Sequence, residues 1–277
     1  MKKIVMFLVF VMIIAGCIPE KKQTLNRYIV TSPEIAEIIY LLQGAENIVG
    51  VTIECDYPAK LLEIEKVGNF GKVDFEKIIS LDPTIVFTSG LEQELLTSEL
   101  NKLQIPTAKF YPESIDDMIS SIREIGILID VEERANFVAD SLQIELNKIT
   151  QNNGDNSPKV YVEIYNNPIM SVSDRSFVGE VIQKSGGDNI FAELPRDYSR
   201  VSAEDVINAD PEIILLTCPP EFTAESIKMR KGWEVISAVK NDRIYTALDV
   251  NPDLIIRATP RVVDGMKQLQ KIFNDEK

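Results

Sequence analysis

Short apolar runs alternate along this chain with segments whose apolar residues recur every three or four positions. Runs of the first kind predict strands, and segments of the second kind predict amphipathic helices. Strands that alternate with helices favour parallel sheets covered by helices. The last helix is predicted over Ile255–Phe273, and the strands are predicted at Tyr28–Ser32, Ile48–Thr52, Thr84–Ser89, Thr107–Tyr111, Lys159–Tyr165, Glu212–Cys218 and Arg243–Leu248.

A stretch of fourteen residues occurs twice. Residues 73–86 align without gaps on residues 201–214, and six of the fourteen positions are identical. Each copy predicts a capped helix, an Asp-Pro turn and a buried strand. Two copies are too few for a repeat array, so they indicate two similar α/β lobes, each with its own sheet.

The segment from Val131 to Gln151 predicts one long helix between the lobes. Its apolar residues fall at spacings of three and four, and neither glycine nor proline interrupts it. About twenty residues at 1.5 Å each span roughly 30 Å, enough to run along both lobes. The predicted N-terminal lobe is therefore 27–130, the connecting helix 131–151 and the C-terminal lobe 152–277. One helical connector should bend less than two or three extended strands would.

The first residues predict a targeting segment rather than a part of the folded lobes. Two lysines precede an apolar run of about eleven residues, Ile4–Ile14, which matches a signal peptide and is too short to span a bilayer. The following Ala15-Gly16-Cys17 resembles the lipobox of prokaryotic lipoproteins. That resemblance implies that the signal peptide 1–16 is removed, that Cys17 carries the lipids, and that 17–26 form the lipidated N-terminus and tether. The alternative is an ordinary signal peptide with an incidental Cys17.

Composition and charge remove several classes of function. The formal net charge of −14 repels phosphate backbones, so we expect no nucleic-acid partner. Histidine is absent, which removes the commonest metal ligand and general base, and with them most zinc sites and hydrolytic triads. The three cysteines form no CxxC pair, and no nucleotide-binding glycine motif occurs. We expect no catalytic residue, no metal site and no resident cofactor.

Eight motifs occur in order along the folded part of the chain. They are Tyr28–Pro33, Val49–Pro58, Lys66–Gly71, Phe75–Ile78 and Leu81–Val86 in the first half, and Gly186–Phe191, Val201–Glu204 and Arg257–Arg261 in the second. Together they resemble the cobalamin and iron-siderophore binding proteins of ABC importers, and the likeness covers nearly all of 27–277. The run Asp56-Tyr57-Pro58 is more similar to the cobalamin branch.

The resemblance implies a two-lobed α/β protein, in which each lobe holds a mostly parallel sheet flanked by helices and one long helix joins the lobes. A small-molecule metal chelate would lie in the cleft between the lobes, and the cleft would close little. The implied partners are the membrane subunits of an ABC importer, and the membrane itself through the N-terminal lipid only. The mature chain would be an extracytoplasmic monomer without enzymatic activity.

Glu76 and Glu204 occupy equivalent positions of the repeat, each in the first turn of its helix. The resemblance implies that this pair contacts arginines on the importer's membrane subunits. Two carboxylates on rigid helices can fix the orientation of a two-lobed body on a two-fold symmetric partner. The alternative is that each glutamate only favours the helix dipole, by about 0.3–1 kcal/mol.

Candidate ligand contacts lie at the carboxyl ends of strands, where open α/β sheets bind ligands. Their aromatic rings could pack against a corrin or a catecholate, or could simply support the core and loops. These candidates are Pro33, Glu34, Asp56, Tyr57, Asn69, Phe70, Gly90 and Leu91 in the first lobe, and Tyr165, Pro219, Glu221, Asp249 and Asn251 in the second.

Arginines and cysteines near the expected cleft leave further alternatives open. An anionic siderophore would need several converging arginines, and the resemblance places Arg257 next to the cleft. The other arginine candidates are Arg175, Arg196, Arg200 and Arg261. Cys55 and Cys218 fall at strand ends that we expect to face the cleft, where they could pair, bind a metal or, as we favour, stay unpaired. Trp233 is interpreted as core packing.

The leading hypothesis is therefore a binding protein for an ABC importer. Cobalamin or another corrinoid is the preferred cargo, a ferric siderophore the second choice, and haem the third because no histidine can bind its iron. Two alternatives from other classes are an extracytoplasmic hydrolase that uses paired carboxylates, and a lipoprotein that assists a membrane complex.

Overall fold

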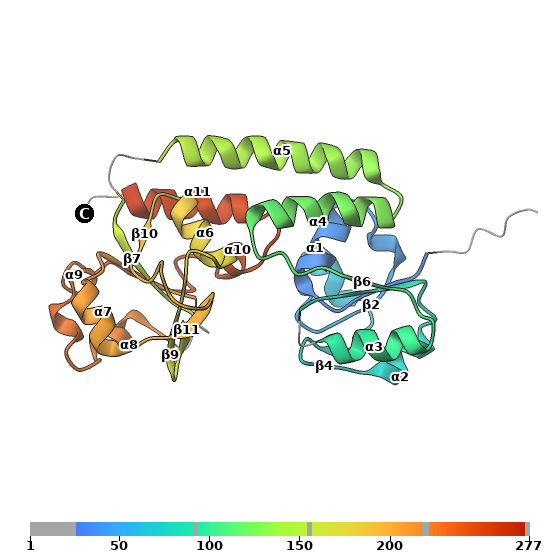
Figure 1. Ribbon diagram of the computed structural model, residues 1–277, viewed down its shortest axis with the longest axis horizontal. Helices are drawn as coiled ribbons and strands as arrows, with labels where there is room; N and C mark the ends of the chain where they lie inside the picture. The colour runs from blue at the N-terminus through green and yellow to red at the C-terminus, as the bar shows by residue number, and fades with distance from the viewer. Residues whose placement is uncertain (1–25, 91–92, 154–156, 218–221, 275–277) are drawn as a thin grey trace, which may run out of the picture.

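The computed structural model describes residues 26–90, 93–153, 157–217 and 222–274. Two lobes lie side by side beneath one long helix, α5 (Figure 1). Within the described ranges, no helix combines the length and the apolar character that a bilayer crossing requires. The predictions made for Cys17, Leu91, Cys218, Pro219 and Glu221 lie outside the described residues.

The N-terminal lobe is built on a four-stranded parallel sheet in the order β2-β1-β5-β6. All four strands predicted for this lobe are present, each one or two residues shorter than its apolar run. The strands are β1 Tyr28–Val30, β2 Ile48–Val51, β5 Ile85–Thr88 and β6 Thr107–Lys109, with the small hairpin β3 Gly68–Asn69 and β4 Lys72–Val73. The helices are α1 Pro33–Leu41, η1 Ala45–Asn47, η2 Ala59–Glu63, α2 Phe75–Ser80, α3 Glu94–Lys102 and α4 Ile115–Leu128.

The C-terminal lobe repeats this sheet in the order β10-β7-β12-β13, again with parallel neighbours. It adds an antiparallel sheet, β11-β9-β8, which the apolar pattern did not predict. The strands are β7 Lys159–Glu163, β8 Tyr165–Asn166, β9 Ile169–Val172, β10 Asp188–Asn189, β11 Tyr198–Arg200, β12 Ile213–Leu216 and β13 Ile244–Tyr245. The helices are α6 Phe177–Lys184, α7 Ala203–Ala209, α8 Ala224–Lys228, η4 Trp233–Val235, α9 Ser237–Lys240, α10 Asp253–Ile256 and α11 Val262–Asn274.

The two copies of the sequence repeat occupy equivalent places in the lobes. In each copy a short helix, α2 or α7, leads into a strand that is third in its sheet, β5 or β12. Asp74 accepts a hydrogen bond from the amide of Lys77 (3.0 Å), and Ser202 accepts one from the amide of Asp205 (3.1 Å), so both helices are capped. Each helix is followed by an aspartate with a φ of 47°, a left-handed conformation that aspartate tolerates. The prediction of two related α/β lobes is confirmed.

Helix α5, Glu132–Gln151, joins the lobes and packs against α4 of the first and α11 of the second (Figure 1). The packing on α4 is close, because a Cβ on Gly126 would lie only 2.1 Å from that of Ala135. Towards α11, the ammonium of Lys267 lies 2.9 Å from the carboxylate of Glu145. The largest apolar core is continuous from the N-terminal lobe through α5 into the C-terminal lobe. The helix therefore acts as a spine fixed to both lobes.

The helix predicted over Ile255–Phe273 is wrong in one respect, because the chain forms two helices there. Helix α10 ends at Ile256, Arg257 is extended (φ −90°, ψ 125°), and α11 begins at Val262. The break comes at Pro260, which lacks an amide hydrogen and drives the preceding residue out of the helical region. The strand predicted over Lys159–Tyr165 likewise ends early, and Tyr165 begins the antiparallel sheet.

Candidate functional site

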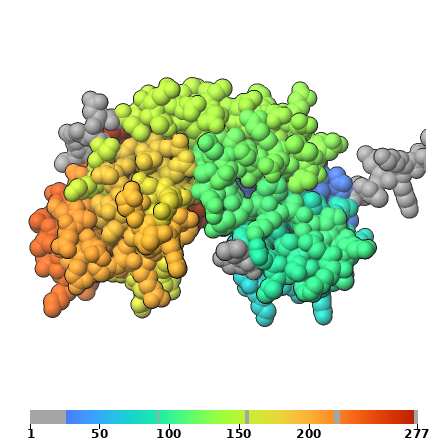
Figure 2. Space-filling view, viewed as in Figure 1, coloured from blue at the N-terminus to red at the C-terminus, as the bar shows by residue number. Residues whose placement is uncertain are grey.

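A cavity of about 260 Å³ lies between the two lobes. Figure 2 shows the hollow between them opening on the side away from α5. From the N-terminal lobe, its lining residues are Ser32, Glu34, Phe70, Ser89 and the run 110–113. From the C-terminal lobe, they are Ser176, Phe177, Asp197, Tyr198, Ile256 and Ala258. Both walls thus combine aromatic rings with carboxylates and hydroxyls.

In the N-terminal lobe, the loops that line the cavity come directly after the ends of strands. Glu34 lies in the first turn of α1, directly after β1, and accepts a hydrogen bond from the hydroxyl of Ser32. Residues 110–113 follow β6, and β5 ends just before Ser89. These are the carboxyl ends of parallel strands, where α/β sheets present their ligand sites. The opposite wall comes from the N-terminus of α6 and from the residues that enter β11.

Phe70 is held in the cavity wall by two buried or half-buried polar side chains. Its amide donates to the carboxylate of Glu54 (2.9 Å), and its carbonyl accepts from the amide nitrogen of Gln93 (3.2 Å). Gln93 is only 2% exposed, and its oxygen accepts from the backbone amide of Ser89 (2.8 Å). One glutamine therefore ties the Phe70 loop to the end of β5.

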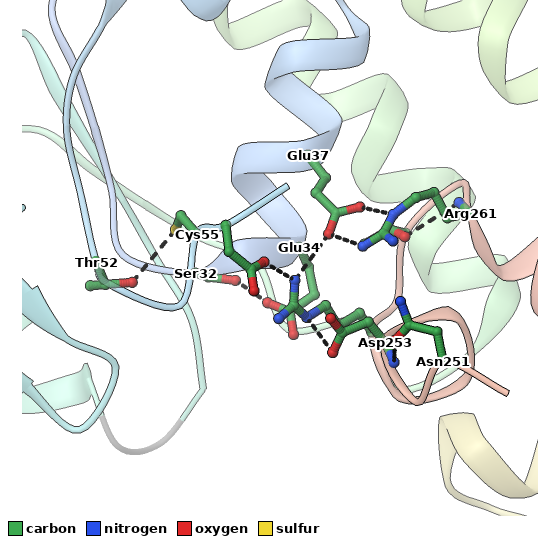
Figure 3. Close-up of polar contacts among 11 residues, drawn as sticks. Ser32, Glu34, Glu37, Thr52, Cys55, Asn251, Asp253 and Arg261 are labelled. Atoms are coloured by element: carbon green, nitrogen blue, oxygen red, sulfur yellow. Dashed lines mark hydrogen bonds and ion pairs between the residues drawn. The ribbon is translucent and has the colours of Figure 1, made fainter. Parts of the chain in front are cut away.

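A second polar group lies where the lobes meet, at the break between α10 and α11. We call it the interlobe charge cluster; its members are Glu37 and Asp56 of the N-terminal lobe and Asp253, Arg257 and Arg261 of the C-terminal lobe. Arg261 holds Glu37 with two hydrogen bonds of 2.6 and 2.5 Å. Arg257 lies 2.7 Å from Asp56, 3.3 Å from Glu37 and 3.1 Å from Asp253. Figure 3 shows Glu37 pointing from α1 towards Arg261 across the junction.

Burial and pairing compete in the charge cluster, and pairing prevails. Burial acts to raise the pKa of Asp56, but the hydrogen bond and charge of Arg257 outweigh it, so this pKa lies below its ordinary value. Burial acts to lower the pKa of Arg257, but the hydrogen bond that it donates to Asp56 and the charges of the carboxylates raise it. Arg261 also lies over the ring of Tyr57, with 3.9 Å between its guanidinium carbon and the ring centre.

The predicted ligand contacts divide into three groups in the structure. Glu34 and Phe70 line the cavity. Asp56, Tyr57 and Arg257 lie at the interlobe charge cluster, where Asp56 and Arg257 pair with each other and Tyr57 stacks on Arg261. The remaining described candidates lie outside the cavity lining, and they are Pro33, Asn69, Gly90, Tyr165, Asp249 and Asn251. A ligand larger than the cavity would have to extend beyond its lining to reach these residues.

Several of the outlying candidates have local structural partners. Asn69 accepts from the amide of Lys72 (2.7 Å) within the β3–β4 hairpin. Asp249 accepts from the amide (2.8 Å) and the hydroxyl (3.0 Å) of Thr246. Pro33 is buried as the first residue of α1, whereas Tyr165 is exposed. Of the other arginine candidates, Arg175 donates to the carbonyl of Leu194 (2.6 Å) and does not line the cavity, and neither Arg196 nor Arg200 lines it.

Sequence reasoning missed important parts of both polar sites. Tyr111 and Glu113 follow β6, so the strand-end rule that selected Glu34 should also have selected them. Asp197 and Tyr198 enter an antiparallel strand that the apolar pattern did not predict. Glu37 carried a signal, because it is an acid among the apolar residues of α1.

The expectation that Cys55 faces the cleft is wrong. Its side chain is fully buried, with its sulfur 3.5 Å from the hydroxyl of Thr52 and 3.9 Å from the carbonyl of Val30. Burial raises the pKa of the Cys55 thiol to about 11, so the thiol is neutral at physiological pH. Cys55 is a free cysteine, and the described part of the chain holds no group of three acidic or cysteine side chains placed to bind a metal.

Glu76 and Glu204 each occupy the second position of their helices, α2 and α7, and both are exposed. Both helices lie on the parts of the lobes away from α5 (Figure 1). The two carboxylates thus stand on separate lobes, free of the cavity lining.

Comparisons with known proteins extend across both lobes. A model of the periplasmic binding protein family matches residues 29–260. The Bacillus subtilis protein YvrC, named an uncharacterized ABC transporter substrate-binding lipoprotein, is 28% identical over 88% of this chain and 78% of its own length. A vitamin B12-binding protein of Vibrio cholerae is 26% identical over 88% of this chain and 87% of its own. The crystal structure of a possible iron-binding (periplasmic solute-binding) protein of Staphylococcus epidermidis superposes with a TM-score of 0.79 at 26% identity, covering 90% of this chain and 99% of that one.

Proposed function

The chain belongs to the periplasmic binding protein family, and we propose that it captures a metal chelate between its lobes for delivery to an ABC importer. The family is one of binding proteins rather than enzymes, so the alternative of a carboxylate-based hydrolase has no support in it. The observation that carries the proposal is the cavity to which both lobes contribute aromatic and polar side chains. Such a mixture suits a flat, partly apolar ligand with polar edges.

Cobalamin or another corrinoid is the cargo we favour, ahead of a ferric siderophore. A relative of similar length, matched along most of both chains, is named a vitamin B12-binding protein. The Staphylococcus epidermidis protein is described as a possible iron-binding protein, so a ferric siderophore is the second candidate cargo. A cargo that extends beyond the lining residues of the cavity would have Asn69 and Tyr165 as further candidate contacts.

We further propose that the mature chain is held at the outer side of the membrane by lipids on Cys17. The Bacillus subtilis relative is named a lipoprotein. Glu76 and Glu204 would then dock on the importer's membrane subunits, one carboxylate from each lobe. Their exposure on rigid, capped helices supports this role.

The test is a visible-range titration of the purified domain 27–277 with cyanocobalamin, a ferric siderophore and haem. We expect saturable binding of one chelate with a dissociation constant near micromolar or below. A Tyr198→Ala variant should weaken it, since this ring faces the cavity; the exposed Phe137 of α5 provides the matched control, Phe137→Ala. Absence of binding to every chelate would refute the proposal and favour a lipoprotein that assists a membrane complex.

A further inference from the structure

The carboxylates of the cavity stand on both of its walls. Glu34 and Glu113 line it from the N-terminal lobe, and Asp197 lines it from the C-terminal lobe. A ligand that touches both lobes is therefore flanked by negative charge on two sides. Because the walls also carry buried aromatic rings and exclude part of the solvent, these charges act over short distances with less screening than on an open surface.

Positive charge is scarce along the same walls, where the exposed guanidinium of Arg175, outside the lining, lies 3.8 Å from the carboxylate of Asp197. None of the described residues that line the cavity is a lysine or an arginine. An anionic chelate would thus meet no basic side chain among the described lining residues.

Two of the arginines expected to serve an anionic ligand, Arg257 and Arg261, are already bound to carboxylates. Arg257 is shared by Asp56, Glu37 and Asp253, and Arg261 holds Glu37 with two hydrogen bonds. Their side chains are only 12% and 16% exposed. Releasing both to a ligand would leave Glu37 buried without a counter-charge, which is costly.

Tyr198 is a neutral hydrogen-bonding group in the cavity wall. Burial is the main reason why the pKa of Tyr198 is raised to about 12, and the neighbouring Tyr111, Asp197 and Glu113 add to the effect. Its phenol therefore stays protonated at physiological pH. It adds a ring and a hydroxyl to the wall and contributes no charge of its own.

We infer that the cleft selects a chelate without net negative charge, whose edge presents N–H donors, and that Glu34, Glu113 and Asp197 set this selection. The inference rests on the proposed function and narrows its substrate class. A neutral corrinoid with carboxamide side chains, or a cationic ferric hydroxamate, offers donors that carboxylates accept in strong, charge-assisted hydrogen bonds. A ferric tris-catecholate and haem, with its propionates, bring like charge against like charge.

The experiment compares chelates of different charge on one set of variants. Cyanocobalamin, cationic ferrioxamine and anionic ferric enterobactin are titrated against the wild-type domain and against a Glu34→Gln, Glu113→Gln, Asp197→Asn variant. A matched control removes three exposed carboxylates from α4 and α5, through Glu124→Gln, Glu132→Gln and Glu133→Gln. The control removes the same number of negative charges but leaves the cavity intact.

We expect the wild type to bind the better of the two non-anionic chelates at least about tenfold more tightly than the anionic one. In the cavity variant, the ratio of the two affinities should shrink at least about tenfold in favour of the anionic chelate. A higher salt concentration should reproduce part of this effect in the wild type. The control should change this ratio less than about twofold. Melting curves and the three single substitutions guard against loss of folding, and each single substitution should move the ratio in the same direction.

The outcomes separate the two claims. Equal or tighter binding of the anionic chelate by the wild type, or equal effects of the cavity variant and the control, overturns the charge selection while the proposed function stands. Failure of every chelate to bind overturns the proposed function and this inference with it.

Discussion

Glu37 is the residue at which the two lobes depend most closely on each other. It lies in α1 among apolar neighbours and is only 5% exposed. A buried carboxylate is costly unless it is paired and hydrogen-bonded. Arg261 and Arg257 satisfy it from the other lobe, so the charge is stable only while the lobes stay together.

Replacing Glu37 by glutamine should therefore lower the free energy of unfolding by about 3–5 kcal/mol, the usual cost of breaking a buried ion pair. The two arginines would keep their charge and lose a common partner. Urea denaturation followed by circular dichroism measures the change. Glu46→Gln, an exposed substitution at the end of the same lobe, is the control and should cost about 0.5 kcal/mol or less. Equal costs for the two variants would contradict the role given to Glu37.

Asp56 gives the charge cluster a defined dependence on pH. Its pKa is lower in the folded protein than its ordinary value of about 4. The stability that its ionised form contributes is thus present above about pH 4 and is lost as the pH falls through the folded-state pKa. The difference in unfolding free energy between wild type and Asp56→Asn should be constant from pH 7 to about pH 5 and shrink below about pH 4. A difference that grew on acidification would have the wrong sign.

At this scale the sequence predicts positions better than partners. Glu34 was found because it follows β1 of the parallel sheet, whereas Phe70 follows β3 of the antiparallel hairpin. Arg257 was placed next to the cleft, but its acidic partners come from residues 37, 56 and 253, and no local pattern links positions so far apart in the chain. Tyr198 was missed because its strand is three residues long and contains two polar residues after the tyrosine.

At the scale of elements, apolar periodicity is informative wherever a strand or helix is buried on a regular face. Every strand predicted from an apolar run is present in the parallel sheets. The antiparallel sheet escaped prediction, since β8 has only two residues and β11 pairs at an edge. Pro260 indicated a break before α11. It was not predicted because the apolar residues on both sides of Pro260 continue the helical spacing.

The prediction about the importer concerns the glutamates on the short helices α2 and α7. Replacing Glu76 and Glu204 together by glutamine should reduce uptake at least about tenfold, because two charge-assisted contacts are lost. Chelate affinity of the purified domain should not change, since neither residue lines the cavity. Uptake by cells and titration of the domain are measured side by side, with Glu132→Gln, Glu133→Gln as the charge-matched control. A fall in affinity would assign the pair to the ligand site instead.

At the scale of the whole molecule, the lobes are joined in three ways. Helix α5 packs on both, the charge cluster links their facing surfaces, and the carboxylate of Glu180 on α6 accepts from the first amide of α4 (2.7 Å). The continuous core beneath α5 adds apolar contact across the junction. The helical pattern predicted the first of these links. The charge cluster was signalled only by Glu37, an acid among the apolar residues of α1, and the contact of Glu180 with α4 was not predicted.

Ligand binding should consequently change the shape of the molecule very little. Small-angle scattering with and without a saturating chelate should give radii of gyration that agree within about 1 Å, the scale of backbone shifts in preformed binding sites. A Glu37→Gln, Arg261→Gln variant is the informative comparison, because it removes a link without touching α5. A large closure of the wild type on binding would refute the idea of a rigid spine.

The proposed membrane attachment requires the N-terminal segment that holds Cys17. Expressed with its signal segment, the Cys17→Ser variant should be recovered in the soluble extracytoplasmic fraction, whereas the wild type should sediment with membranes. The lipid on Cys17 is the only membrane-binding element that we propose, and no described helix suits a bilayer. Sedimentation of the variant with membranes would show that another part of the chain binds there.

A spine that keeps the lobes apart by a constant amount also keeps Glu76 and Glu204 at a constant spacing. Empty and loaded molecules would then show the importer nearly the same pair of carboxylates and would compete for it on equal terms. The rate of uptake would follow the fraction of molecules that are loaded, rather than the number of loaded molecules. Raising the amount of protein at fixed cargo should, past a certain point, slow uptake instead of speeding it.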